Sequence, residues 1–185
     1  MNINDLQRIY FLGIGGIGMS AIARFFKQSG KEVYGYDLTE SILTKKLEDE
    51  GMHIHYTDDV TLIPEGIDLV IYTPAIPEEH KELNWLRSQD YVIMKRAEVL
   101  GLLSETMYTI AVAGTHGKTT TSSLIAHLLN YCGKKVDAFL GGILTDYGTN
   151  FLKGDGEIVV VEADEYDRSF LQLSPDCLAI MSLDA

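Results

Sequence analysis

A glycine-containing loop that ends in a lysine and a run of hydroxyl side chains is the stretch of this sequence best suited to chemistry. It is VAGTHGKTTT at 112–121, and it follows an apolar segment typical of a buried strand. Small residues let backbone N–H groups converge on phosphate oxygens, the following helix presents its positive end, and Lys118 adds a charge. Thr119 or Thr120 can ligate magnesium. The stretch therefore predicts a nucleotide phosphate site, although Val112 stands where a strict Walker motif has glycine.

A second glycine cluster lies near the start of the chain. Gly13, Gly15 and Gly18 form a GxGxxG pattern between an expected strand at 8–13 and a helical pattern, and Asp37 follows the next expected strand. Read alone, the pattern is a dinucleotide fingerprint, in which glycines approach a pyrophosphate and the acid accepts a ribose hydroxyl. A lone GxGxxG is weak evidence, and tight packing of helix on strand without a ligand is the alternative.

Acidic residues follow a third apolar run. The run IVVV at 158–161 leads directly into Glu162, and Asp164, Glu165 and Asp167 come next. One carboxylate at the end of a strand beside a phosphate loop is how P-loop enzymes hold magnesium or its water shell. A solvated acidic turn is the alternative. We expect Glu162 to take the magnesium role, because the end of the strand can face the loop, and the other three acids stay ambiguous.

These motifs together resemble the Mur ligases, the cytoplasmic enzymes that build the peptidoglycan stem peptide. GTHGKTTT is similar to the ATP loop of that family, and His116, where asparagine is usual, resembles the branch that acts on UDP-N-acetylmuramate. Three other segments agree with this branch, in the expected order over nearly the whole chain: FLGIGGIGMSAIA at 11–23, RAEVL at 96–100 and VEADEYDRSFLQL at 161–173.

The resemblance implies a ligase that uses ATP and Mg²⁺. The γ-phosphate would pass to the muramyl carboxylate, and the amine of L-alanine, or of a preformed peptide in a recycling relative, would displace phosphate from the acyl phosphate. Lys118 would neutralise phosphate charge, Thr119 and Glu162 would help hold Mg²⁺, and His116 would lie near the transferred phosphoryl group. The ATP-binding residues implied are Gly114, Thr115, His116, Gly117, Lys118, Thr119 and Thr120.

In the same family the first domain binds the UDP part of the substrate. The resemblance places the glycine loop against the pyrophosphate of UDP-N-acetylmuramate, Asp37 near the uridine, and TPAIP at 73–77 at a strand end that faces the substrate. His80 departs from the family pattern and is expected to be a solvated helix residue. The substrate-binding residues implied are Gly13, Gly15, Gly16, Gly18, Asp37, Thr73, Ala75 and Ile76.

Strand and helix patterns alternate along the chain, which indicates an α/β fold with a parallel sheet flanked by helices. We expect a Rossmann-like domain over 1–104 and, from a new buried strand at 108–113, an incomplete P-loop-type α/β domain over 105–185. The helix after the second loop is expected to bury one apolar face. That face comprises Leu124, Ile125, Leu128, Leu129 and Cys132. Because the sequence stops just after an apolar strand, we expect the 185 residues to bind substrate without turnover.

Composition excludes some partners and leaves two other classes of function open. A net charge of −12 argues against a nucleic-acid partner, and the absence of a long apolar segment or signal peptide argues against a membrane and for a cytoplasmic protein. Cys132 and Cys177 are expected to be reduced core thiols. A nicotinamide dehydrogenase would use the first glycine loop but leaves Lys118 unexplained, and a non-catalytic binding module is the other alternative. The sequence sets no oligomeric state.

Overall fold

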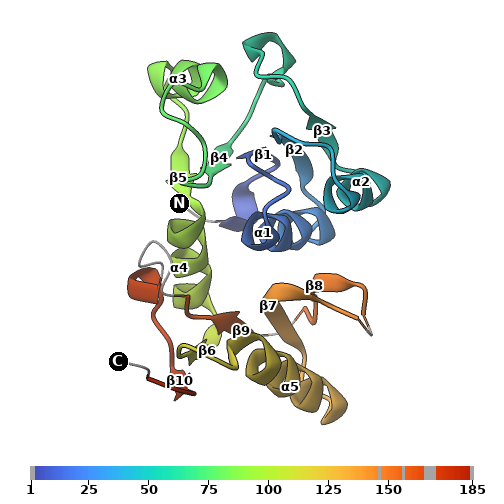
Figure 1. Cartoon of the computed structure of the whole chain (residues 1–185), viewed down its shortest axis with the longest axis vertical. Coiled ribbons are helices and arrows are strands. Elements are labelled where there is room, and N and C mark those ends of the chain that lie inside the picture. Colours follow the sequence, from blue (N-terminus) through green and yellow to red (C-terminus); the bar gives the residue numbers. More distant parts are fainter. Residues whose placement is uncertain (1–2, 146, 156, 165–169, 184–185) are drawn as a thin grey trace. The chain divides into compact units, whose positions relative to one another are not determined.

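The computed structural model describes residues 3–145, 147–155, 157–164 and 170–183, which form two compact units, 1–96 and 97–185. Figure 1 shows the elements of each unit along the chain. The first unit holds η1 (Ile3–Asp5), β1 (Arg8–Leu12), α1 (Ile17–Gln28), β2 (Glu32–Tyr36), α2 (Ile42–Asp49), β3 (His53–His55), η2 (Val60–Leu62), β4 (Leu69–Tyr72), α3 (Lys81–Ser88) and β5 (Ile93–Lys95). The second holds α4, which begins at the junction (Arg96–Thr106), β6 (Tyr108–Ala113), α5 (Lys118–Tyr131), β7 (Val136–Leu144), β8 (Thr149–Leu152), β9 (Ile158–Glu162) and β10 (Cys177–Ile180).

The first unit is built on a five-stranded sheet in the order β3-β2-β1-β4-β5, in which every pair is parallel. From β1 the chain adds β2 and then β3 on one side of the sheet, and from β4 it adds β5 on the other side. The carboxyl ends of β1 and β4 therefore flank a topological switch point, where open α/β sheets usually bind their ligands. The parallel sheet flanked by helices confirms the fold expected from the sequence.

Alternate side chains of β1 enter the two layers that cover the sheet. Phe11 meets Phe26 of α1 edge to face, with ring centroids 6.4 Å apart. Tyr10 and Leu12 point to the opposite face, where they join a cluster that includes Leu83 of α3. This alternation is the period of a strand buried on both faces. It makes β1 the rigid centre of the unit and fixes the loop that follows it.

The second unit has a five-stranded sheet in the order β10-β6-β9-β7-β8. The pairs β10·β6, β6·β9 and β9·β7 are parallel, and β8 is antiparallel to β7. Helix α5 packs on this sheet through Ala126, which lies in one cluster with Val136 and Val160. The antiparallel strand was not expected, because a segment of 4 residues carries too little periodicity to be recognised.

Helix α5 buries only part of the face that its apolar residues predict. Ile125 and Leu129 pack against the cluster that contains Ala126. The side chains of Leu124 and Leu128 are 55% and 58% exposed, whereas Ser122 and Ala126 are fully buried. Small residues at the contact let the helix axis approach the sheet closely, so the inward face is centred on Ser122 and Ala126 and leaves Leu124 and Leu128 outside it. Cys132, at the end of this helix, is exposed, and so is Cys177. The expectation of two core thiols was therefore wrong.

The division between the units falls at Arg96 and Ala97, where β5 is followed by α4. The sequence predicts a later limit, after residue 104, and the assignment of a separate role to each domain stays a prediction. Within the part of the chain that the structure describes, no helix combines the length and the apolar character needed to cross a bilayer.

Candidate functional site

The first glycine loop joins β1 to α1 and is held by the backbone of β2. The N–H groups of Gly13 and Ile14 both donate to the carbonyl oxygen of Tyr36, at 2.8 and 3.1 Å. The N–H of Gly16 donates back to Gly13, at 3.3 Å, and Gly16 caps the start of α1 without a side-chain bond. The loop is thus a tight turn whose last N–H groups lie at the positive end of a helix, the arrangement that favours phosphate.

Asp37 anchors this loop from the end of β2. Its Oδ2 accepts a hydrogen bond from the N–H of Gly15 at 2.7 Å, and its Oδ1 accepts one from the N–H of Thr39 at 3.2 Å. The sequence prediction gave Asp37 a place near a ribose or uridine. The structure shows a carboxylate already bonded to the loop backbone, so it also holds the loop in shape. A Cβ atom at position 15 would lie 2.9 Å from Oδ2 and 2.7 Å from Cγ2 of Thr44, which leaves no room for a side chain.

The loop after β4 meets the first glycine loop at the switch point. A Cβ atom at position 13 would lie 2.6 Å from Cγ2 of Thr73 and 3.5 Å from Cδ1 of Ile76, so both side chains pack directly on Gly13. The N–H of Thr73 donates to the carbonyl of Leu12 at 3.3 Å, which ties the two loops together. Ala75 lies exposed in the same turn. The structure therefore brings the predicted substrate residues of the two loops to one edge of the sheet.

His80 lies elsewhere in the unit and differs from its expectation. It is 6% exposed rather than solvated, it caps α3 by accepting from the N–H of Leu83 at 3.4 Å, and its ring packs edge-on against Tyr36 at 4.5 Å. Its Nδ1 is 3.4 Å from a carboxylate oxygen of Asp58, which also receives the N–H groups at the start of α3. His80, which departs from the family pattern, therefore forms a buried N-cap of α3.

The second glycine loop joins β6 to α5 and closes around Lys118. The ammonium Nζ donates to the carbonyl oxygen of Gly114 at 2.7 Å. Gly114 and Gly117 have φ values of +122° and +82°, which side chains rarely adopt, and Gly117 is the left-handed residue that precedes α5. These two glycines let the backbone curl so that its N–H groups and the lysine face one space. That these residues bind phosphate stays a prediction.

Ser182 supports the same loop from the end of β10, and sequence reasoning missed it. Its hydroxyl accepts from the N–H of His116 at 2.9 Å, and its carbonyl accepts from the N–H of Thr115 at 3.1 Å. A Cβ atom at Gly114 would collide with the Ser182 backbone at 2.8 Å, so glycine is required there for contact as well as for its φ value. The only sequence signal was its place after a parallel strand. Thr115, His116, Gly117 and Thr120 are exposed at the mouth of the loop.

The side chains of Glu162 and Thr119, both predicted to hold magnesium, are hydrogen-bonded to each other, and their role stays a prediction. Glu162 is the last residue of β9 and pairs with Val112 of β6, so its side chain leaves the sheet at the start of the loop. Its Oε2 accepts from the Thr119 hydroxyl at 3.0 Å, and its Oε1 accepts from the N–H of Gly141 at 2.7 Å and from the Ser122 hydroxyl at 3.1 Å. A Cβ atom at Gly141 would lie 2.6 Å from the carboxylate.

The acidic residues that follow Glu162 do not extend this cluster in the part of the chain the structure describes. Glu165 and Asp167 lie outside the described residues, and Asp164 accepts from the backbone of Phe170 through its carbonyl at 3.3 Å. No group of three or more histidine, cysteine or acidic side chains suited to a metal occurs among the residues described. Among the described residues, the side-chain oxygens that meet at this place are the carboxylate of Glu162 and the hydroxyls of Thr119 and Ser122.

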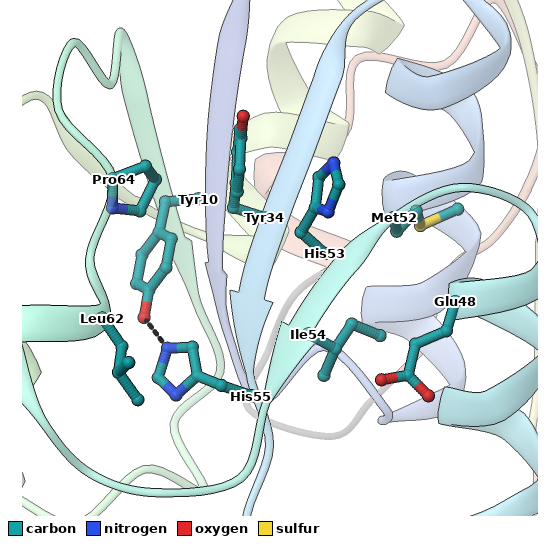
Figure 2. A pocket seen from close by; sticks show the side chains of 9 residues that line it. All are labelled: Tyr10, Tyr34, Glu48, Met52, His53, Ile54, His55, Leu62 and Pro64. Carbon is teal, nitrogen blue, oxygen red and sulfur yellow. Dashed lines mark hydrogen bonds between the residues drawn. The ribbon is translucent and has the colours of Figure 1, made fainter.

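A cavity of about 460 Å³ lies on the first sheet, and none of the residues that line it belongs to the first glycine loop (Figure 2). Tyr10, Tyr34, His53 and His55 give it an aromatic lining, and in the close-up His55 is bonded to the Tyr10 hydroxyl, at 2.8 Å. The same hydroxyl donates to the buried carboxylate of Glu82 at 2.5 Å. Burial raises the pKa of Glu82 and lowers the pKa of His55. The cavity contains none of the residues predicted to bind substrate.

Two strand–loop–helix units, each with glycines at the carboxyl end of a parallel strand, place this chain in the class of phosphate-binding α/β proteins. Comparison with known proteins narrows the class. The family model described as Mur ligase family, catalytic domain, matches residues 8–108, from the first residue of β1 to the first residue of β6. The chain belongs to the Mur ligase family.

Curated relatives agree with the family match. A UDP-N-acetylmuramate–L-alanine ligase of Cytophaga hutchinsonii is 55% identical over 193 residues, which cover 100% of this chain and 41% of the relative. The enzyme of the same name from Christiangramia forsetii is 50% identical, with 100% and 42% covered. The crystal structure of UDP-N-acetylmuramate-alanine ligase MurC from Thermotoga maritima superposes with a TM-score of 0.83 at 35% identity, over 94% of this chain and 40% of that one. The chain thus spans about 42% of the length of its curated relatives.

Proposed function

We propose that these residues form the part of an ATP-dependent ligase that binds UDP-N-acetylmuramate and the phosphates of ATP, in an enzyme that joins L-alanine to the muramyl carboxylate. The observation that carries the proposal is the convergence of Lys118, Thr119 and Glu162 at one loop of a chain that belongs to the Mur ligases. The curated relatives that match the chain from end to end carry the name of that reaction.

The first unit binds the UDP-sugar in this proposal. The pyrophosphate lies against the N–H groups of the turn from Gly13 to Gly18, and the loop that carries Thr73, Ala75 and Ile76 walls the other side of the switch point. Asp37 holds the turn in shape through its hydrogen bond to Gly15, and the uridine lies on the surface next to Asp37. Packing of the Thr73 methyl on Gly13 fixes the spacing of the two loops, which positions the sugar.

The second unit binds ATP. Lys118 is placed to neutralise the β and γ phosphates, and the N–H groups of Thr115 and His116, held by Ser182, line the mouth of the loop. His116 follows the turn at a point where its ring can reach the transferred phosphoryl group. A nicotinamide dehydrogenase, the alternative function, would not use this loop, and dehydrogenase activity does not fit a member of the Mur ligase family.

The oxygen set at Glu162 fits Mg²⁺. Magnesium prefers oxygen ligands in octahedral geometry and usually takes one or two from the protein and the others from water and phosphate. Oε2 of Glu162 and the hydroxyl of Thr119 lie 3.0 Å apart next to the lysine, and Oε1 is fixed by Gly141 and Ser122, so the free edge of the carboxylate is oriented. A bound Mg²⁺ would supply positive charge at the γ-phosphate during transfer.

The chemistry then proceeds in two balanced steps. An oxygen of the muramyl carboxylate attacks the γ-phosphorus, a P–O bond forms, and ADP leaves with the electrons of the broken P–O bond. The amine of L-alanine attacks the carbonyl carbon of the acyl phosphate, phosphate leaves, and the amine loses its proton to water or buffer. Neither step needs a nucleophile from the protein, and the loops contribute by positioning and by charge neutralisation.

A chimera tests the proposal. These 185 residues would replace the matching residues of the Cytophaga hutchinsonii relative, so that its remaining length completes the enzyme. The proposal predicts phosphate release that requires ATP, Mg²⁺, UDP-N-acetylmuramate and L-alanine together. Release with a preformed tripeptide in place of L-alanine would move the assignment to the recycling ligases. A chimera that binds both nucleotides and releases phosphate with neither amine would refute it.

A further inference from the structure

Arg96 lies against the first glycine loop, although sequence analysis gave it no role. It is the first residue after β5 and the first of α4, so it leaves the sheet at the carboxyl edge that carries both loops of the switch point. Its side chain packs on Gly18 in the first turn of α1. A Cβ atom at position 18 would lie 2.0 Å from Nη1, 3.0 Å from Cδ and 3.1 Å from Cζ of Arg96.

This contact gives Gly18 a purpose other than a turn. The residue lies inside α1, where glycine is less favourable than alanine by about 1 kcal/mol, so the helix itself gains nothing from it. The space that a methyl group would need is filled by the guanidinium. Any side chain at position 18 would have to push Arg96 away from the start of the helix.

The charge of Arg96 is uncompensated in the part of the chain that the structure describes. The first N–H groups of a helix carry partial positive charge, and a cation beside them is repelled. No hydrogen bond or ion pair joins the Arg96 guanidinium to a described residue, and the carboxylate near the loop, Asp37, is bonded to Gly15 and Thr39. The guanidinium beside Gly18 and the N–H groups at the start of α1 are both positive, so an anion that contacts both would stabilise the site.

We propose that Arg96 is a ligand of the substrate diphosphate and makes the first unit prefer a nucleoside diphosphate to a monophosphate. This inference rests on the proposed function, because it takes the UDP part of the substrate as the occupant of the loop. One phosphate lies on the N–H groups of the loop. The guanidinium reaches the second from Gly18, and its planar fork can donate two parallel hydrogen bonds to one phosphate.

Binding of uridine, UMP, UDP and UDP-N-acetylmuramate to the chain, measured by calorimetry, tests this proposal. We expect Arg96→Ala to weaken UDP and UDP-N-acetylmuramate by about tenfold or more and UMP by less than about threefold, since a charge-assisted contact to one phosphate is lost. Lys95→Ala, which removes the same charge one residue earlier, should bind all four ligands as the unaltered chain does. Arg96→Lys, which keeps the charge without the fork, should fall between.

Gly18→Ala tests the same contact from the other partner and serves if Arg96→Ala unfolds. It should reproduce the selective loss of UDP, and the double variant should lose no more than either single one, because both remove one interaction. Equal weakening of UMP and UDP, or full UDP affinity in Arg96→Ala, would overturn the role of Arg96 and leave the proposed function intact. If the unaltered chain binds none of the uridine ligands, the proposed function fails as well.

Discussion

Substitution of Lys118 by alanine is expected to remove most of the affinity for ATP. The lysine contributes a charge-assisted contact to phosphate, worth about 1.5–3 kcal/mol, and such a loss weakens binding by roughly 10- to 150-fold. The structure allows this loss to be separated from collapse of the loop. Ser182 holds the N–H groups of Thr115 and His116 from β10, so the loop keeps these anchors when the bond from Lys118 to Gly114 is gone.

The assay is displacement of a fluorescent ATP analogue in the presence of Mg²⁺. Lys134→Ala is the matched control, because it removes an exposed lysine of the same unit just beyond the end of α5 and should leave the dissociation constant unchanged. Thermal unfolding of both variants checks that the second unit is intact. If Lys118→Ala binds ATP within twofold of the unaltered chain, the phosphate-loop assignment is wrong.

Four further outcomes follow from the contacts described. Glu162→Gln should reduce the gain in ATP affinity on adding Mg²⁺ by about tenfold or more, since a neutral amide replaces the only carboxylate that faces Thr119 among the described residues. Gly15→Val should abolish binding of UDP-N-acetylmuramate, because a Cβ there would already lie 2.7 Å from Thr44 Cγ2. Burial raises the pKa of Glu82, so the folded state holds its proton above the ordinary value of 4.5 while the unfolded state has lost it. The free energy of unfolding should therefore fall as pH rises from 4.5 through the raised pKa, and by less in Glu82→Gln. Finally, the 185 residues alone should not release phosphate with all substrates saturating. Holding the muramyl carboxylate and the γ-phosphate close together accounts for roughly 7–11 kcal/mol of the barrier, and we expect this chain by itself not to hold both in place.

Each of these predictions has a result that would contradict it. Unchanged Mg²⁺ dependence in Glu162→Gln would remove the residue from the cation site, with Glu157→Gln as the exposed control. Retained UDP-sugar affinity in Gly15→Val would show that the loop does not meet the ligand. An identical pH slope in Glu82→Gln, measured by denaturant unfolding, would assign the dependence to other groups. If this chain alone releases phosphate in a way that depends on L-alanine, the further length of its relatives is not needed for the reaction.

The sequence was sufficient to predict the parallel sheets and the two glycine loops. Strands buried on both faces are continuous apolar runs, and a glycine cluster directly after such a run has few structural meanings other than a turn at a strand end. Glu162 could be placed for the same reason, since a parallel strand ends at a known edge. Once the strand order is known, the carboxyl edge of the sheet shows which loops lie next to one another.

Contacts that depend on the exact approach of two elements could not be predicted. Ser182 and Arg96 lie after strands that are distant in sequence from the loops they touch, and nothing in a single sequence pairs β10 with β6 or brings Arg96 to Gly18. The buried face of α5 was only partly predicted: Ile125 and Leu129 pack on the core, but close packing selected Ser122 and Ala126 over Leu124 and Leu128. His80 was misassigned because a helix cap can be buried under an aromatic ring, here that of Tyr36.

Calorimetric titration of the chain with UDP-N-acetylmuramate and, separately, with NADH is the most direct test of the central claim. Both ligands carry a pyrophosphate, so a glycine loop alone does not decide between them, and the surrounding residues must. The assignment to the Mur ligases predicts saturable heat with UDP-N-acetylmuramate, competition by UDP and none by NADH. Binding of NADH with no response to UDP or the UDP-sugar would contradict it.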